Sequence, residues 1–113
     1  MIIYNVTVTL NENIHSRWVE WIRKEHIPEV LSTRLFKKAV LSRIISDKEL
    51  TYAIAYYAEN ISKLESYKKN YSNQLRQKSF EKFGDSALSF RTELELIDES
   101  VSYTHLRAHE TFR

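Results

Sequence analysis

The sequence contains no cysteine, and glycine and proline occur once each among 113 residues. Without cysteine there are no disulfide bonds, thiolate metal sites or thiol nucleophiles, and this fits a reducing compartment, so we expect a cytoplasmic protein. No apolar run approaches the roughly 20 residues needed to cross a bilayer, and the opening residues Met1 to Asn5 lack the basic region of a secretion signal. The formal charge of +2 is too near neutral to favour a nucleic-acid or membrane surface. With 42% hydrophobic and 28% charged residues, the composition predicts one small soluble domain.

The last segment of the chain has no apolar period and no helix cap. It resembles the translation of a transposase-type sequencing adapter, because consecutive codons of such an adapter encode Val101 to Glu110. We therefore expect residues 1–99 to form the domain and residues 100–113 to be a non-native, disordered tail. His105 and His109 have the i, i+4 spacing of a metal-binding pair, but their place in this tail leaves no predicted metal site.

The first half of the chain reads as a strand followed by a helix. Residues 2–10 alternate between apolar and polar side chains, which predicts a strand with one buried face. Apolar residues at helical spacing then predict a helix over about 12–25. Pro28 has no N–H and crowds the residue before it, so the helix should break or kink near His26.

Two apolar blocks, residues 35–46 and 50–58, are separated by a polar linker without glycine and predict an antiparallel hairpin with a loose connection. The residues Ser62-Lys63-Leu64-Glu65 form a capping box that opens a helix to about Lys82, and Gly84 supplies its left-handed end. A last strand covers 86–97. Its apolar alternate residues are expected to face inward: Leu88, Phe90, Thr92, Leu94 and Leu96.

This order, β-α-β-β-α-β, predicts an α+β ferredoxin-like sandwich, a four-stranded antiparallel sheet with two helices on one face. The other face is left bare and is expected to carry Asn5, Thr7 and Arg91 beside apolar groups of the hairpin. An exposed apolar surface of several hundred Å² is unusual in a monomer. We therefore expect a homodimer that packs sheet to sheet and encloses a cavity.

The segment from Trp18 to Leu31, with its Glu25-His26-Ile27-Pro28 core, resembles the helix-one motif of the dimeric α/β-barrel superfamily, which includes the ethyl tert-butyl ether degradation family. With the opening strand, Phe83-Gly84 and Phe90-Arg91-Thr92, residues 1–97 resemble a family of short bacterial proteins of unknown function. The resemblance implies the ferredoxin-like fold and a dimer, and no established activity.

Two residues are candidates for chemistry. His26 at the expected helix break could act as a general base, or its ring could hydrogen-bond helix-end carbonyls and hold the kink. Arg91 on the bare face could hold a carboxylate or enolate oxygen, or it could pair with Glu93 or the partner subunit.

The remaining candidates are side chains expected to line the enclosed cavity. Tyr52 and Tyr56 could offer phenol donors to a ligand, or could simply pack, and Thr7 and Asn5 share the bare face with Arg91. The scattered histidines and carboxylates form no metal-ligand set. Neither a glycine-rich phosphate loop nor a nucleophile elbow occurs, and residues 51–58 lack the glycine and arginine of an RNA-binding strand motif.

These observations leave two classes of function open. The first is a homodimeric interaction or small-molecule-binding module that takes an apolar or weakly acidic metabolite, or a protein partner, without cofactor or metal. The alternative is a cofactor-independent oxygenase or isomerase-type enzyme acting in the sheet-lined cavity, with Arg91 as oxyanion clamp and His26 as base.

Overall fold

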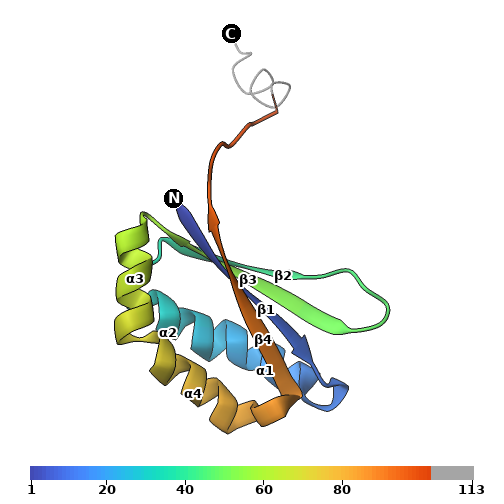
Figure 1. Ribbon diagram of the computed structural model, residues 1–113. Helices are drawn as coiled ribbons and strands as arrows, with labels where there is room; N and C mark the ends of the chain where they lie inside the picture. The colour runs from blue at the N-terminus through green and yellow to red at the C-terminus, as the bar shows by residue number, and fades with distance from the viewer. Residues whose placement is uncertain (103–113) are drawn as a thin grey trace.

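The structure, a computed structural model, describes residues 1–102 of the chain. The strands of this part are β1 (Ile2–Leu10), β2 (Lys38–Arg43), β3 (Leu50–Ala58) and β4 (Ala87–Glu95). The helices are α1 (His15–Trp21), α2 (Ile27–Leu31), α3 (Ile61–Asn70) and α4 (Ser72–Phe83), with a π-helical turn (Ile22–His26) and 3₁₀ turns (Glu12–Ile14 and Gly84–Ser86). The strands form an antiparallel sheet in the order β2-β3-β1-β4, and the helices lie against one face of it (Figure 1). The predicted ferredoxin-like sandwich is confirmed.

The expected tail lies largely beyond this part of the chain. Residues 103–113, with His105 and His109, are outside the described residues, and residues 96–102 have no regular secondary structure. Within the described range, no helix combines the length and the apolar character that crossing a membrane requires.

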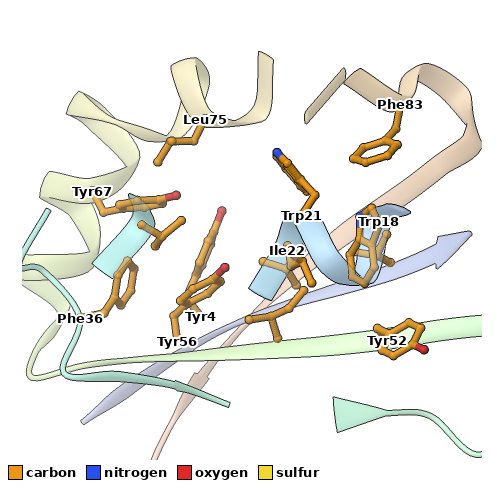
Figure 2. Close-up of a cluster of buried hydrophobic side chains, with 14 of the residues drawn as sticks. Tyr4, Trp18, Trp21, Ile22, Phe36, Tyr52, Tyr56, Tyr67, Leu75 and Phe83 are labelled. Atoms are coloured by element: carbon orange, nitrogen blue, oxygen red, sulfur yellow. The ribbon is translucent and has the colours of Figure 1, made fainter. Parts of the chain in front are cut away.

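The core lies between the helices and the face of the sheet that they cover, here called the covered face. Every second residue of β1 and of β3 points into this core. Directly opposite residues of an antiparallel pair, such as Val6 and Ile54, project to the same side of the sheet. Large side chains from the helices, among them Trp18 and Leu75, complete the core (Figure 2). Trp18 and Leu64 are almost completely buried. Burial of this apolar area is the main source of the fold's stability.

The first helical segment runs through Pro28 without ending. The interruption predicted near His26 takes the form of the π-helical turn, in which the N–H of Ile27 donates to the carbonyl of Ile22. In an α-helix the ring of Pro28 would press against the carbonyl of Lys24. A wider turn relieves that contact, so the helix can continue as α2.

The second helical segment differs from the prediction in two places. The cap of α3 is Asn60 and not Ser62, because the Asn60 Oδ1 accepts from the N–H of Lys63 at 3.0 Å. Tyr71 leaves helical geometry, with φ −129° and ψ −32°, and divides the expected helix into α3 and α4. The helix ends at Gly84 as predicted, with φ at +56°, but ψ at −136° departs from the left-handed helical conformation expected there.

Strand β4 faces the opposite way from the prediction. Its register pairs Arg91 with Val6 and Phe90 with Thr7, so Arg91 lies on the covered face and Phe90 on the uncovered one. The prediction assumed that the apolar alternate residues of β4 point inward. Pairing with β1 along the whole strand sets the opposite phase, and a shift of one residue exchanges the two faces of a strand.

The uncovered face of the sheet has a small centre and an apolar margin. Asn5 and Thr7 lie there, as predicted, and the amide of Asn5 donates to the Thr7 hydroxyl at 3.3 Å. Ala53 and Ala55 of β3 lie beside them. Large apolar side chains on the outer strands stay exposed, by 41 to 63%: Val40, Leu88, Phe90 and Leu94.

Candidate functional site

A small cavity lies between the helices and the covered face, beside strand β4. This inner cavity has a volume of about 50 Å³, and an open outer groove of about 420 Å³ adjoins it between α4 and β4. The two spaces share lining residues from both elements, so they form one continuous site. The shared residues are Arg76, Ser79, Ala87, Ser89 and Arg91.

Three tyrosines bring hydroxyl groups to the inner cavity. Tyr4 of β1 and Tyr56 of β3 are directly opposite in the sheet, and the ring of Tyr67 from α3 lies 5.8 Å from that of Tyr4. Figure 2 shows the hydroxyls of the three rings directed into the same space between the sheet and the helices. Burial raises the pKa of Tyr56 and of Tyr67 well above the ordinary value. The hydroxyls of Tyr56 and Tyr67 therefore stay protonated and can donate hydrogen bonds to an acceptor in the cavity.

The π-helical turn places His26 in the same cavity. Its ring stacks on Trp21, with 4.7 Å between the ring centroids and 25° between the planes. The Nδ1 atom of His26 is buried and has no hydrogen-bond partner among the described residues. Burial lowers the pKa of His26 to about 4; Glu29 opposes this shift, and Arg91 and Lys78 add to it. The imidazole is therefore neutral at pH 7, and Nδ1 is available to a bound molecule.

Arg91 enters the site from β4. One terminal nitrogen of its guanidinium donates to the Ser89 hydroxyl at 3.0 Å. Its Nε–H is buried and has no partner among the described residues. A buried donor on a charged group costs free energy when it stays unpaired, of the order of 1–3 kcal/mol. A bound acceptor would remove this cost.

The site carries positive charge without an acidic counterpart. Arg76 and Arg91 line it, and none of the described residues that line the inner cavity or the outer groove is an aspartate or a glutamate. The carboxylate of Glu93, on the same face of β4, instead accepts from Lys68 at 2.7 Å, and Glu29 pairs with Lys78. Within residues 1–102 no ion pair joins either arginine to a carboxylate.

This arrangement suits the recognition of a small oxyanion. A guanidinium, the phenols of the tyrosines and one ring N–H of a neutral imidazole can donate to oxygen atoms held in one small space. The inner volume corresponds to one or two water molecules, at about 30 Å³ each, and so to a group of carboxylate size. No group of three metal-ligating side chains occurs among the described residues.

The structure brings three of the predicted site residues together, on the opposite side of the sheet from the one expected. Arg91, Tyr56 and His26 line the inner cavity on the covered face. The predicted bare-face position of Arg91 and Tyr56 is wrong. Arg91 was misplaced by the reversed phase of β4, and the even-numbered residues of β3, including Tyr56, share a face with the core of β1.

The other predicted ligand-binding residues lie away from this cavity. Tyr52 is also on the covered face and not on the bare one, but its hydroxyl pairs with His15 Nε2 at 2.7 Å, and its ring packs against Trp18. Asn5 and Thr7 are on the uncovered face, separated from Arg91 by the sheet itself.

Three residues of the site were missed by the sequence analysis: Tyr4, Tyr67 and Arg76. The two tyrosines read as core, since they occupy apolar positions of a strand and a helix, and nothing in the sequence marks their hydroxyls as facing a cavity. A signal for Arg76 was present. It follows Leu75, a buried position of α4, and so stands at the margin of that helix's inner face.

Solved structures of very different sequence share this fold. A dimeric ferredoxin-like protein from an uncultured marine organism is 11% identical, with a TM-score of 0.71 over 88% of this chain and 97% of that one. A protein of the ethyl tert-butyl ether family from Bacillus halodurans is 15% identical, with a TM-score of 0.62 over 86% of this chain and 100% of that one. A protein from Deinococcus radiodurans, provisionally assigned as an antibiotic biosynthesis monooxygenase, is 10% identical, with a TM-score of 0.64 over 90% and 97% of the two chains. At these identities the likeness establishes the fold alone.

No curated protein matches the sequence. One family profile does, over residues 1–97, and this range contains every strand and helix found within residues 1–102 and the residues that line the site. The match ends before the segment that the sequence analysis sets aside as a tail. The chain belongs to the family described as Domain of unknown function (DUF4286).

Proposed function

We propose that the protein is a cytoplasmic homodimer whose subunits each bind a small organic anion in the inner cavity. The observation that carries this proposal is the buried, unpaired Nε–H of Arg91, beside the unpaired Nδ1 of His26, in a cavity without acidic residues. A bound carboxylate would satisfy both the charge and the free donor. The ligand site is thus inside each subunit, under its helices, and not between the two sheets.

Thermal stability in the presence of small carboxylates tests this proposal. Acetate, pyruvate and benzoate are each added to the full chain, because a ligand that binds only the folded state raises the melting temperature with its concentration. At least one should do so, and Arg91→Gln should abolish the rise. Arg23→Gln, which removes an equal charge from an exposed position, should preserve it. Indifference to every anion, or an equal loss in both variants, would contradict the proposal.

The uncovered face supports the dimer. Leu88, Phe90 and Leu94 form an exposed apolar strip on β4, and the small centre of the sheet beside them would let a second sheet approach closely. A second copy of the chain is the occupant that fits best, since two identical apolar strips can cover one another about a twofold axis. The dimeric description of a protein with the same fold supports the same reading.

Light scattering behind a sizing column tests the dimer. The protein should elute with twice the mass of one chain, and Phe90→Glu should convert it to a monomer, because the change buries a charge in the interface. Ile61→Glu is the matched control: Ile61 is 51% exposed against 61% for Phe90, but it lies on α3, on the helical side. A monomeric parent protein at millimolar concentration would rule out the dimer and leave the anion site untouched.

A second function, proton transfer, is favoured by one observation. His26 and Arg91 line the same cavity, so a carbonyl acid held by the arginine could place an α-hydrogen near an unprotonated imidazole. Exchange of the methyl hydrogens of pyruvate into D₂O, followed by NMR, would detect this. Exchange catalysed by the protein and lost in His26→Phe would support an enzyme, whereas binding without exchange would leave a binding module.

A further inference from the structure

The outer groove continues the charge pattern of the inner cavity. Arg76 projects from α4 and lines both spaces, while Arg91 reaches them from β4 on the opposite wall. Neither arginine has a carboxylate partner among the described residues. Glu29, whose charge acts on His26, forms an ion pair with Lys78. The site therefore holds two positive charges that no acidic side chain compensates.

The two spaces differ in size, and this limits what each can hold. The inner cavity of about 50 Å³ admits a single carboxylate-sized group. The rest of any ligand must lie in the groove, which has about 420 Å³. Arg76 is exposed there and so remains free to turn toward a ligand.

The groove is polar along most of its length. Side-chain amides of Asn73 and Gln77 and the hydroxyls of Ser79 and Ser89 line it, and Phe80 is its one large apolar side chain. A ligand with a long apolar tail would leave these polar groups facing hydrocarbon, at a cost in free energy. A ligand whose outer end is itself anionic would instead meet the guanidinium of Arg76 and hydrogen-bonding neighbours.

We propose that the ligand is a short dicarboxylate, with one carboxylate in the inner cavity on Arg91 and the other in the outer groove on Arg76. This inference rests on the proposed anion-binding function and adds the second charged group. The tyrosine hydroxyls and His26 surround the inner carboxylate, and Arg76 selects for the outer one.

Calorimetric titration of the full chain with matched ligands tests this inference. Glutarate and its mono-amide, glutaramate, have the same length and shape and differ in one charge; succinate and adipate vary the length. The best dicarboxylate should bind about tenfold more tightly than its mono-amide, as expected for one additional charge-assisted hydrogen bond. Arg76→Gln should remove this tenfold preference and leave the affinity for the mono-amide unchanged.

The control and the opposing outcomes are distinct. Lys82→Gln removes a positive charge from an exposed position of the same helix, outside the lining of the groove, and should keep the preference. Equal affinities for diacid and mono-amide, or equal weakening of both by Arg76→Gln, would overturn the dicarboxylate inference. Binding of benzoate or butyrate as tight as that of every dicarboxylate, and dependent on Arg91, would overturn it too, while preserving the proposed function. Failure of every carboxylate to bind would defeat both.

Discussion

On the face of the sheet beneath the helices, the central strands contribute large side chains that are almost completely buried, such as Ile54 at 1% exposure and Tyr56 at 3%. On the other face the same strands contribute Ala53, Ala55 and Thr7. The edge strand β4 inverts this division, with Arg91 under the helices and Phe90 on the open side. Burial of apolar area explains the central strands by itself, but not β4.

The inversion is explained if neither side of β4 is needed to build the hydrophobic core of the subunit. Under the helices, the polar side of β4 closes a cavity with Ser89 and Arg91. On the open side, Leu88, Phe90 and Leu94 offer an apolar strip to a second copy. Under the proposed function, the disagreement between the hydrophobic phase of β4 and that of its sheet is explained by a ligand site on one face and a dimer interface on the other.

The largest difference between the faces should appear on truncating a large apolar residue of each. Ile54→Ala on the covered face should lower the free energy of unfolding by about 2–5 kcal/mol, since it removes a fully buried side chain and leaves a cavity. Val40→Ala, at a position 41% exposed on the open face, should cost less than about 1 kcal/mol. Urea denaturation measures both. An equally large cost for Val40→Ala would mean that the open face is buried as deeply as the core.

The next effect comes from His26 and depends on pH. Its pKa is about 4 in the fold against 6.5 when exposed, so below pH 6.5 the unfolded chain takes up a proton that the folded chain does not. The free energy of unfolding therefore does not change with the protonation of His26 above pH 6.5, and it falls as the pH is lowered from 6.5 toward 4. The loss should approach, and not exceed, about 3 kcal/mol.

His26→Phe isolates this contribution, because phenylalanine keeps a ring that can stack on Trp21 and cannot take up a proton. The stability of the parent protein minus that of the variant should decline between pH 6.5 and 4.5 in urea denaturation. Carboxylates titrate in both proteins and cancel in the difference. Parallel curves for the two proteins over this range would show that His26 is not held neutral by the fold.

The sequence was sufficient for the fold because its strongest signals are local and periodic. Alternation in residues 2–10 and 50–58, and the helical spacing around Trp18, each identify an element, and their order leaves the ferredoxin-like sandwich. The break at Tyr71 was not visible, because residues on both sides of it continue a helical spacing. Such a break depends on packing against the sheet and not on local preference.

The site was only partly predictable, for a related reason. His26, Arg91 and Tyr56 were identified by residue type, but alternation in β4 determines only which residues share a face, and not which face is covered. The hydrogen bonds to β1 determine that, and they are not local in sequence. Arg91 was therefore assigned to the wrong side, and its neighbours Tyr4 and Tyr67 could not be recognised as its partners.

The smallest predicted effect concerns Gly84, which opens the turn that leads into β4. Its backbone, at φ +56° and ψ −136°, lies in a region that other residues rarely adopt, although an added Cβ would meet no atom within 4 Å. Gly84→Ala should therefore cost about 1–2 kcal/mol through the backbone alone. Ser86→Ala in the same turn keeps the backbone carbonyl that accepts from the N–H of Asn11, and should change the stability by less than about 0.5 kcal/mol.

Gly84→Ala can also change which residues of β4 lie on each face of the sheet, which an ordinary loss of stability would not do. If the strained turn relaxes by moving the start of β4 by one residue, Arg91 leaves the cavity and Phe90 turns under the helices. The variant would then lose anion binding and dimerisation together, more than its loss of stability explains. If the register holds, the contacts between Val6 and Arg91 persist in NMR spectra, and only the melting temperature falls. Retention of parent stability by Gly84→Ala would contradict the strained turn and leave the pairing with β1 as the sole determinant of the phase.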